Sequence, residues 1–148
     1  MRRIDSLIPA IQSVDTRLAI PRGVICLLSA LEFHELTNQF PLETWVAVER
    51  NHTIPHKKEF DLRIIRMSKT HFECGIEEHR IQGAKVRVYS PAKTVVDCFK
   101  FRNKIGMDVA REALKDSLAQ RKATPAEIYQ HAKVCRMLNV MMPYLEMA

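Results

Sequence analysis

Cysteine and histidine are the residues through which this chain could most readily do nucleophilic or metal chemistry. The four cysteines lie far apart along the chain, in a pattern that matches neither a CxxC zinc motif nor a dense disulfide framework: Cys26, Cys74, Cys98 and Cys135. His52 and His56 are four residues apart, but Pro55 stands between them, so the two rings are not expected on one helical face. The sequence therefore predicts reduced, mostly buried thiols, no metal site and no cofactor.

Acidic residues in the middle of the chain raise one catalytic alternative, a metal-dependent nuclease. Such an enzyme holds its metal through acidic ligands on adjacent strands beside a lysine, and Asp61, Glu77, Glu78 and Lys85 are the residues from which it could be built. Their spacing lacks a tight Glu-x-Lys pair, and solvent-facing strand charges account for them more simply. Because the chain has only four glycines, it has no glycine-rich loop to cradle a phosphate. We expect a binding protein rather than an enzyme.

Basic residues are concentrated in the C-terminal half of the chain. The net charge is +6 overall, but residues 85–136 hold 12 basic and 5 acidic side chains, whereas residues 1–84 hold 11 of each. Such a basic segment attracts an acidic partner, which could be nucleic acid, a phosphate-rich ligand or an acidic protein. A solvated, lysine-rich helical surface without a partner explains the same composition.

Helical spacing gathers these basic residues into one patch. At 100° per residue, Lys93, Asp97, Lys100 and Lys104 fall along one stripe, in which Asp97 can pair with Lys93 and Lys100. Contacts from such a patch to phosphates are salt-sensitive and independent of base sequence, and no aromatic platform or reading helix accompanies it. With the next helix added, the predicted partner-binding or nucleic-acid-binding patch consists of Lys93, Lys100, Lys104, Arg111, Lys115, Arg121 and Lys122.

The first third of the chain predicts two helical segments. Residues 3–19 carry apolar side chains at spacings of three and four, interrupted by Pro9, which indicates a linker-like helical segment over residues 1–20. The run Val24–Leu36 is apolar almost all round until its last turn, and this pattern is typical of a buried helix.

Strands are expected in the middle of the chain. Thr44–Glu49 and Phe60–Met67 are rich in β-branched, aromatic and other apolar residues, which favour extended backbone. The strongest signal is a hairpin, in which Ile76–Ile81 and Ala84–Tyr89 flank a turn at Gln82-Gly83.

From Ser90 onward the apolar spacing changes from two to 3.6, and helices are expected to the end of the chain. Ser90 is a good N-cap followed by proline, so one helix should run from there to about Asn103. Gly106 should separate it from a second helix over Met107–Gln120. A capping box beginning at Thr124 starts a third, and a short helix over Asn139–Met147 follows.

Together these elements predict an α+β fold: a buried N-terminal helix, a small, mostly antiparallel sheet with a hairpin, and then a helical C-terminal half. The longest nearly apolar run, Val24–Leu31, is too short to cross a bilayer. The N-terminus lacks the apolar run and cleavage site of a secretory signal. We therefore expect a cytoplasmic protein that has no membrane partner.

Two long motifs, Pro21–Thr37 and Val88–Lys100, resemble the C-terminal domain of AbiEi-type antitoxins. The resemblance continues through Arg102–Ala110 and the tail at Pro143–Glu146, so that it covers about residues 15–146. Antitoxins of this type belong to bacterial type IV toxin–antitoxin systems, which act in abortive infection, a form of phage defence. On this resemblance, residues 21–148 form the antitoxin-like domain.

The resemblance implies a transcriptional regulator without enzymatic activity that represses its own operon and counteracts a cognate toxin with a nucleotidyltransferase-like fold. In such antitoxins an N-terminal winged helix-turn-helix reads the operator, and the C-terminal domain is associated with toxin neutralisation. The motifs of this sequence start at residue 21, which leaves too few residues for a winged helix before them. Residues 1–19 then resemble the linker to such a domain, and operator reading is not expected of this chain.

The resulting expectation is an antitoxin domain that binds its toxin, or the toxin's nucleic-acid target, through the basic patch. Non-specific contacts to the DNA backbone would assist operon autorepression. Two alternatives stay open: the metal-dependent nuclease built on the strand acids, and a dimerisation or scaffold module that forms a homodimer.

Overall fold

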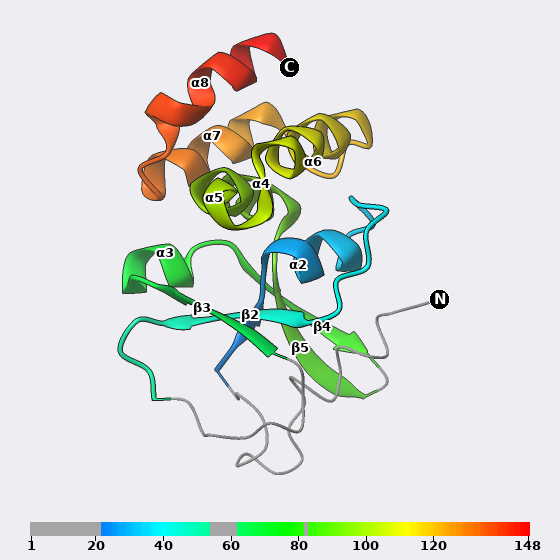
Figure 1. The fold of residues 1–148 in the computed structure, drawn as a ribbon, viewed down its shortest axis with the longest axis vertical. Helices are drawn as coiled ribbons and strands as arrows, with labels where there is room; N and C mark the ends of the chain where they lie inside the picture. The colour runs from blue at the N-terminus through cyan, green and yellow to red at the C-terminus, as the bar shows by residue number, and fades with distance from the viewer. Residues whose placement is uncertain (1–21, 54–61, 82) are drawn as a thin grey trace.

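Helices cover one side of a twisted five-stranded sheet (Figure 1). The computed structural model describes residues 22–53, 62–81 and 83–148, and in these ranges it contains seven helices and five strands. The α+β class and the helical C-terminal half agree with the expectation from the sequence. The helical segment expected over residues 1–20 lies outside the described residues.

The sheet is mixed. Its strands, in the spatial order β3-β2-β1-β5-β4, are β1 (Val24–Ile25), β2 (Thr44–Glu49), β3 (Leu62–Met67), β4 (Ile76–Ile81) and β5 (Ala84–Tyr89). The pairs β1–β2 and β4–β5 are antiparallel, whereas β2–β3 and β1–β5 are parallel. The expectation of a mostly antiparallel sheet is therefore wrong. Only the β4–β5 pair is joined by a short turn, so its antiparallel direction alone follows from residues that are neighbours in the chain. The other pairings are long-range, and residue spacing does not encode their direction.

The single helix expected over Val24–Leu36 is divided into β1 and a shorter helix, α2 (Leu27–Phe33). Cys26 is extended between them and caps the helix without a side-chain hydrogen bond. β1 lies at the centre of the sheet, where Ile25 is in register with Val46 on one side and Val88 on the other. A run of apolar residues is compatible with a fully buried strand as well as with a buried helix. Pairing with β2 and β5 determines that its first residues form a strand.

The remaining helices follow the expected order with two differences: a short helix is added before the hairpin, and the helix expected from Ser90 to about Asn103 is divided after Lys100. They are α3 (Lys69–Glu73), α4 (Pro91–Lys100), α5 (Arg102–Ile105), α6 (Met107–Ala119), α7 (Pro125–Val134) and α8 (Leu138–Met147). The caps form as their residue types predict: Ser90 accepts from the Lys93 backbone N–H, and Thr124 and Glu127 form a reciprocal capping box. The short helix α3 had no periodic signal. In the described part of the chain, no helix combines the length and apolar character needed to cross a bilayer.

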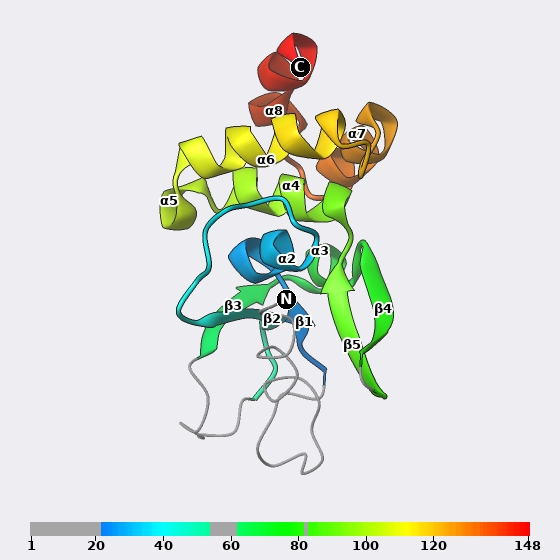
Figure 2. The same cartoon turned by 90° about the vertical axis from the view of Figure 1, so that its right-hand side faces the viewer.

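Helix α4 is the centre of the structure. It packs against α2 on the side of the sheet and against α6 and α7 on the other side, so it lies between two layers (Figures 1 and 2). Every residue from Ala92 to Phe99 is buried. An α-helix surrounded in this way has no solvent face, whatever the periodicity of its sequence suggests.

The two faces of the sheet contribute apolar side chains to two different clusters. Ala47, Ile65 and Tyr89 belong to the large core that contains Val95, Val96 and Phe99 of α4. A second cluster contains alternate residues of the central strands, namely Ile25, Val46, Val48, Val86 and Val88. This alternation fixes the register, because a shift of one residue would exchange the two sets.

Three helices end in left-handed residues that are not glycine. Glu35 after α2, Arg121 after α6 and Arg136 after α7 have φ angles of 60°, 59° and 60°. In each case the next N–H returns to a carbonyl inside the helix, as in the 2.7 Å bond from Met137 to Ala132. These are Schellman ends, at which glycine avoids the steric cost that an L side chain meets in the left-handed region.

The Arg136→Gly substitution should therefore stabilise the protein. We expect its free energy of unfolding to rise by about 0.5–1 kcal/mol, since relief of the left-handed strain exceeds the extra freedom that glycine gives the unfolded chain. Lys133→Gly, at an exposed helical position of α7, is the matched control. It should lower the free energy of unfolding by about 1 kcal/mol. Urea denaturation of both variants measures these changes, and a loss of stability in Arg136→Gly would contradict the strain argument.

Candidate functional site

The predicted basic patch is exposed over most of its length. Lys100 at the end of α4, Lys104 in α5, and Arg111 and Lys115 in α6 are exposed, as is Arg121 just after α6. Because α5 contacts both α4 and α6, these elements form one connected part of the helical layer. Arg111 is also 2.9 Å from the exposed carboxylate of Asp108, one turn before it.

Two predicted members of the patch are placed differently. The ammonium of Lys122 donates a hydrogen bond to the backbone oxygen of His34, so this half-buried side chain joins the end of α6 to the end of α2. Lys93 is fully buried, with 0% of its surface exposed. Its assignment to the binding surface is therefore wrong, because both sides of α4 are covered at its position.

Lys93 instead belongs to a buried polar cluster. Its Nζ is 3.0 Å from Oδ2 of Asp97, one turn later in α4, and 3.6 Å from the centre of the Tyr89 ring. The other carboxylate oxygen, Oδ1, is 2.6 Å from Nε2 of His71 in α3. Each charged group thus has two partners, and this compensates for the water that it loses on burial. The expected Lys93–Asp97 pairing is present, but in the core.

Tyr89 closes the cluster on the side of the sheet. Its hydroxyl donates to the backbone oxygen of Phe72 at 2.6 Å, and burial, together with the charge of Asp97, raises its pKa, so that the phenol stays neutral. The Tyr89 backbone oxygen accepts a hydrogen bond from His34 at 2.8 Å. Burial lowers the pKa of His34, although this hydrogen bond opposes the effect.

Gly75 provides the space for the Lys93 side chain. A Cβ at position 75 would lie 2.6 Å from Cβ of Lys93 and 2.9 Å from its Cγ, and the φ angle of +78° is one that L side chains rarely adopt. The glycine is therefore needed both for its conformation and for the close approach of α4.

The thiols differ in environment. Cys26 and Cys98 are fully buried, and burial raises the pKa of both. Cys74, which is half-buried, lies with its Sγ 2.9 Å from Nδ1 of His131. A hydrogen bond from Cys135 lowers the pKa of Cys74 to about 4 against the opposing effect of burial, and His131 adds to the lowering. The expectation of mostly buried, unpaired thiols agrees with the structure. Sequence spacing gave no sign of this cluster, because its members lie on α3 and α7.

His71, Asp97 and Cys135 also have the donor types of a metal site, with donor atoms that lie within 4.8 Å of one another. However, both oxygens of Asp97 already accept hydrogen bonds, one from His71 and one from Lys93. The ammonium 3.0 Å from the carboxylate also opposes a divalent cation. We therefore assign this group to the buried polar cluster.

The two strand acids that the structure describes, Glu77 and Glu78, do not share a face of the sheet. Glu77 and Glu78 are neighbours in β4, so their side chains project to opposite faces. Glu77 pairs with His79 at 2.9 Å and Glu78 with Lys85 at 3.8 Å. Asp61 lies outside the described residues, as does His56.

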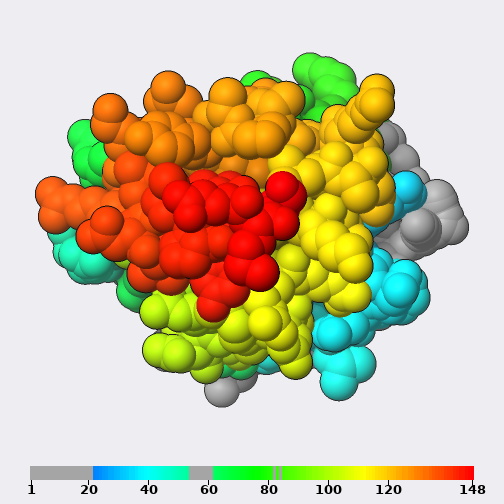
Figure 3. Space-filling model, turned by 90° about the horizontal axis from the view of Figure 1, so that it is seen from above, coloured from blue at the N-terminus to red at the C-terminus, as the bar shows by residue number. Residues whose placement is uncertain are grey.

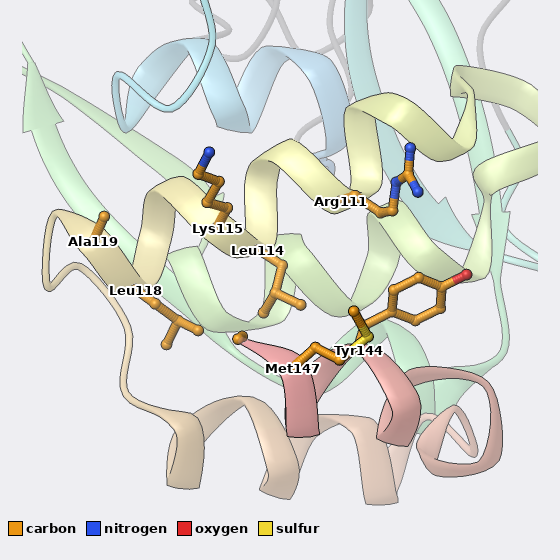
Figure 4. A pocket seen from close by; sticks show the side chains of 8 residues that line it. Arg111, Leu114, Lys115, Leu118, Ala119, Tyr144 and Met147 are labelled. Atoms are coloured by element: carbon orange, nitrogen blue, oxygen red, sulfur yellow. The ribbon is translucent and has the colours of Figure 1, made fainter.

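An apolar groove lies between α6 and α8 on the surface away from the sheet. Seen from above, α8 crosses this surface with α7 on one side and α6 on the other (Figure 3). Leu114 and Leu118 point from α6 toward α8, where Tyr144 and Met147 form the opposite wall (Figure 4). The groove has a volume of about 590 Å³, and Arg111 and Lys115 add positive charge on its α6 side. These two are the predicted patch residues that line it.

Comparison with known proteins does not assign this site. No model of a known protein family matches the chain, and no curated protein matches its sequence.

The buried cluster leads to a stability prediction. Asp97→Ala should lower the free energy of unfolding by about 3–5 kcal/mol, because it leaves the Lys93 charge buried without its counterion. Asp97→Asn should also destabilise the protein, since it keeps the shape but removes the charge.

Asp108→Ala is the matched control, because Asp108 also pairs with a basic residue of its own helix but is 93% exposed. Chemical denaturation should find this variant almost as stable as the parent protein. Equal effects of the two alanine substitutions would show that the Lys93–Asp97 pair is not a determinant of stability.

Proposed function

We propose that this chain is the toxin-binding domain of a type IV antitoxin, a transcriptional regulator acting in the bacterial cytoplasm. Its function would be binding rather than catalysis, and its partner a nucleotidyltransferase-like toxin. The observation that carries the proposal is the apolar groove between α6 and α8, beside the exposed cations of α4, α5 and α6.

The contact between the two longest antitoxin-like motifs supports the family part of this proposal. The motif Pro21–Thr37 contains β1 and α2, and the motif Val88–Lys100 contains the end of β5 and all of α4. Ile25 in the first is in register with Val88 in the second, and α2 packs against α4. Motifs that are distant in sequence but joined in the core are expected where a shared fold underlies a resemblance.

The composition of the groove favours a protein partner over a nucleic acid. Leucine, methionine and tyrosine walls with an arginine beside them are typical of the centre of a protein interface. Nucleic-acid surfaces instead collect basic residues with few apolar side chains around them. The toxin surface that fits is therefore acidic with an apolar centre.

Binding to DNA is a secondary role in this proposal. Lys100, Lys104, Arg111 and Lys115 can contact phosphates, which would help to hold the antitoxin near its operator. Such contacts carry no base specificity.

The test is a charge reversal of Lys100, Lys104, Arg111 and Lys115 to glutamate. The affinity for the cognate nucleotidyltransferase-like toxin that this proposal requires should fall about tenfold or more, as measured by calorimetry. Growth rescue on co-expression with that protein should fall in parallel.

The control reverses four exposed basic residues elsewhere, namely Lys69, Arg80, Lys85 and Lys133, with the same change in net charge. It should leave the affinity and the rescue almost unchanged. Leu118→Asp should weaken toxin binding without a comparable loss of binding to a random DNA duplex. If the two charge-reversal variants behave alike, or if only DNA binding is lost, this surface does not bind the toxin.

A further inference from the structure

Two of the four cysteines meet at the ends of helices that are far apart in the sequence. Cys74 is the C-cap residue of α3, and Cys135 is the C-cap residue of α7. The Cys74 sulfur is 2.9 Å from Nδ1 of His131, one helical turn before Cys135 in α7, and each of the two thiols shifts the pKa of the other. The two side chains therefore lie close together, and no disulfide joins them. Formation of a bond between them would therefore cross-link α3 directly to α7.

The accessibility of the two sulfurs gives them different roles. Cys74 is half-buried and Cys135 is buried, with 4% of its surface exposed. His131, whose Nδ1 is 2.9 Å from the Cys74 sulfur, lines a polar pocket of about 250 Å³ together with Gly75. A small polar reagent can therefore reach the neighbourhood of Cys74 before it reaches Cys135.

Hydrogen bonds and positive charges around Cys74 favour its thiolate form. The hydrogen bond from Cys135 lowers its pKa most, followed by the hydrogen bond and positive charge of His131 and by the charge of the buried Lys93, while desolvation acts in the opposite direction. The same hydrogen bond and burial raise the pKa of Cys135. A thiolate beside a protonated thiol is the arrangement of an attacking and a resolving cysteine.

We propose that Cys74 and Cys135 are a peroxide-reactive thiol pair, in which Cys74 is oxidised first and Cys135 then closes a disulfide with it. The class of reactant is a small hydroperoxide. This inference is independent of toxin binding.

The reaction balances in two steps. The Cys74 thiolate attacks one oxygen of the hydroperoxide, the O–O bond breaks, and the departing oxygen takes the proton that His131 donates, which gives a sulfenic acid and water or an alcohol. The sulfur of Cys135 then attacks the sulfur of Cys74, the S–O bond breaks, and hydroxide leaves with the Cys135 proton as water. Two thiols are oxidised, one peroxide is reduced, and a dithiol reductant of the cell can reverse the change.

The first experiment is the oxidation of the whole chain with a small excess of hydrogen peroxide. Mass spectrometry of the denatured product should find a mass lower by about 2 Da before alkylation. After alkylation it should find only two of the four thiols modified and a cross-linked peptide pair containing Cys74 and Cys135. Cys135→Ser should stop at a Cys74 sulfenic acid that dimedone traps, and Cys74→Ser should remain unoxidised. Cys98→Ser is the control and should form the same disulfide as the parent protein.

The second experiment uses the unsubstituted protein, so it does not depend on whether a variant folds. The rate of alkylation at Cys74 by iodoacetamide should be almost constant between about pH 5.5 and 7.5, whereas an ordinary cysteine gains about tenfold per pH unit in this range. His131→Gln should move the rise of the Cys74 profile to higher pH. Cys26 and Cys98 in the folded protein should remain unreactive.

Three results would overturn the proposal. One is a Cys74 profile that rises with pH like that of a free cysteine. Another is a disulfide that involves Cys26 or Cys98. The third is one zinc ion per chain bound to the reduced protein and released by peroxide, because Cys74 and Cys135 would then be metal ligands rather than a redox pair.

Discussion

The buried ion pair of Lys93 and Asp97 is the constraint on which the helical half of the structure depends. Charges in a protein interior are tolerated only when their partners are fixed in place, since an unpaired charge there costs several kcal/mol, about as much as the whole stability of a small domain. Here the partners come from three elements: the pair itself lies in α4, the Tyr89 ring belongs to β5, and His71 belongs to α3. The polar cluster therefore holds the central helix in one position relative to the sheet. Hydrophobic packing alone is less specific, because it is not directional.

Several local features follow from this pair. Gly75 has no side chain because α4 approaches it at Lys93, and the Tyr89 hydroxyl is held by Phe72 so that its ring faces the ammonium. The reactivity proposed for Cys74 has the same origin in part, because the charge of Lys93 lowers the pKa of that thiol. A residue that the sequence places in a surface stripe is thus the centre of the core.

The region proposed for binding lies on the other side of α4, in the layer formed by α6 and α8. This layer is not independent of the core, since the Tyr144 ring, which lines the groove, packs 5.3 Å from the ring of Phe99 in α4. The buried face of α4 thus supports the wall of the groove, while the cations of α5 and α6 remain in solvent.

The sequence by itself determined the elements that local chemistry specifies. The caps at Ser90 and Thr124 and the β4–β5 hairpin formed as predicted, because the residues that encode each of them are neighbours in the chain. The helical character of the chain after Ser90 also agrees with the prediction, although the first of these helices is divided into α4 and α5. Tertiary structure alone decided the parallel pairings of the sheet, the division of Val24–Leu36 into β1 and α2, and the meeting of Cys74 with His131. It also decided the burial of Lys93. Helical periodicity shows which residues share a face, but whether that face meets water or another element depends on contacts between segments distant in the chain.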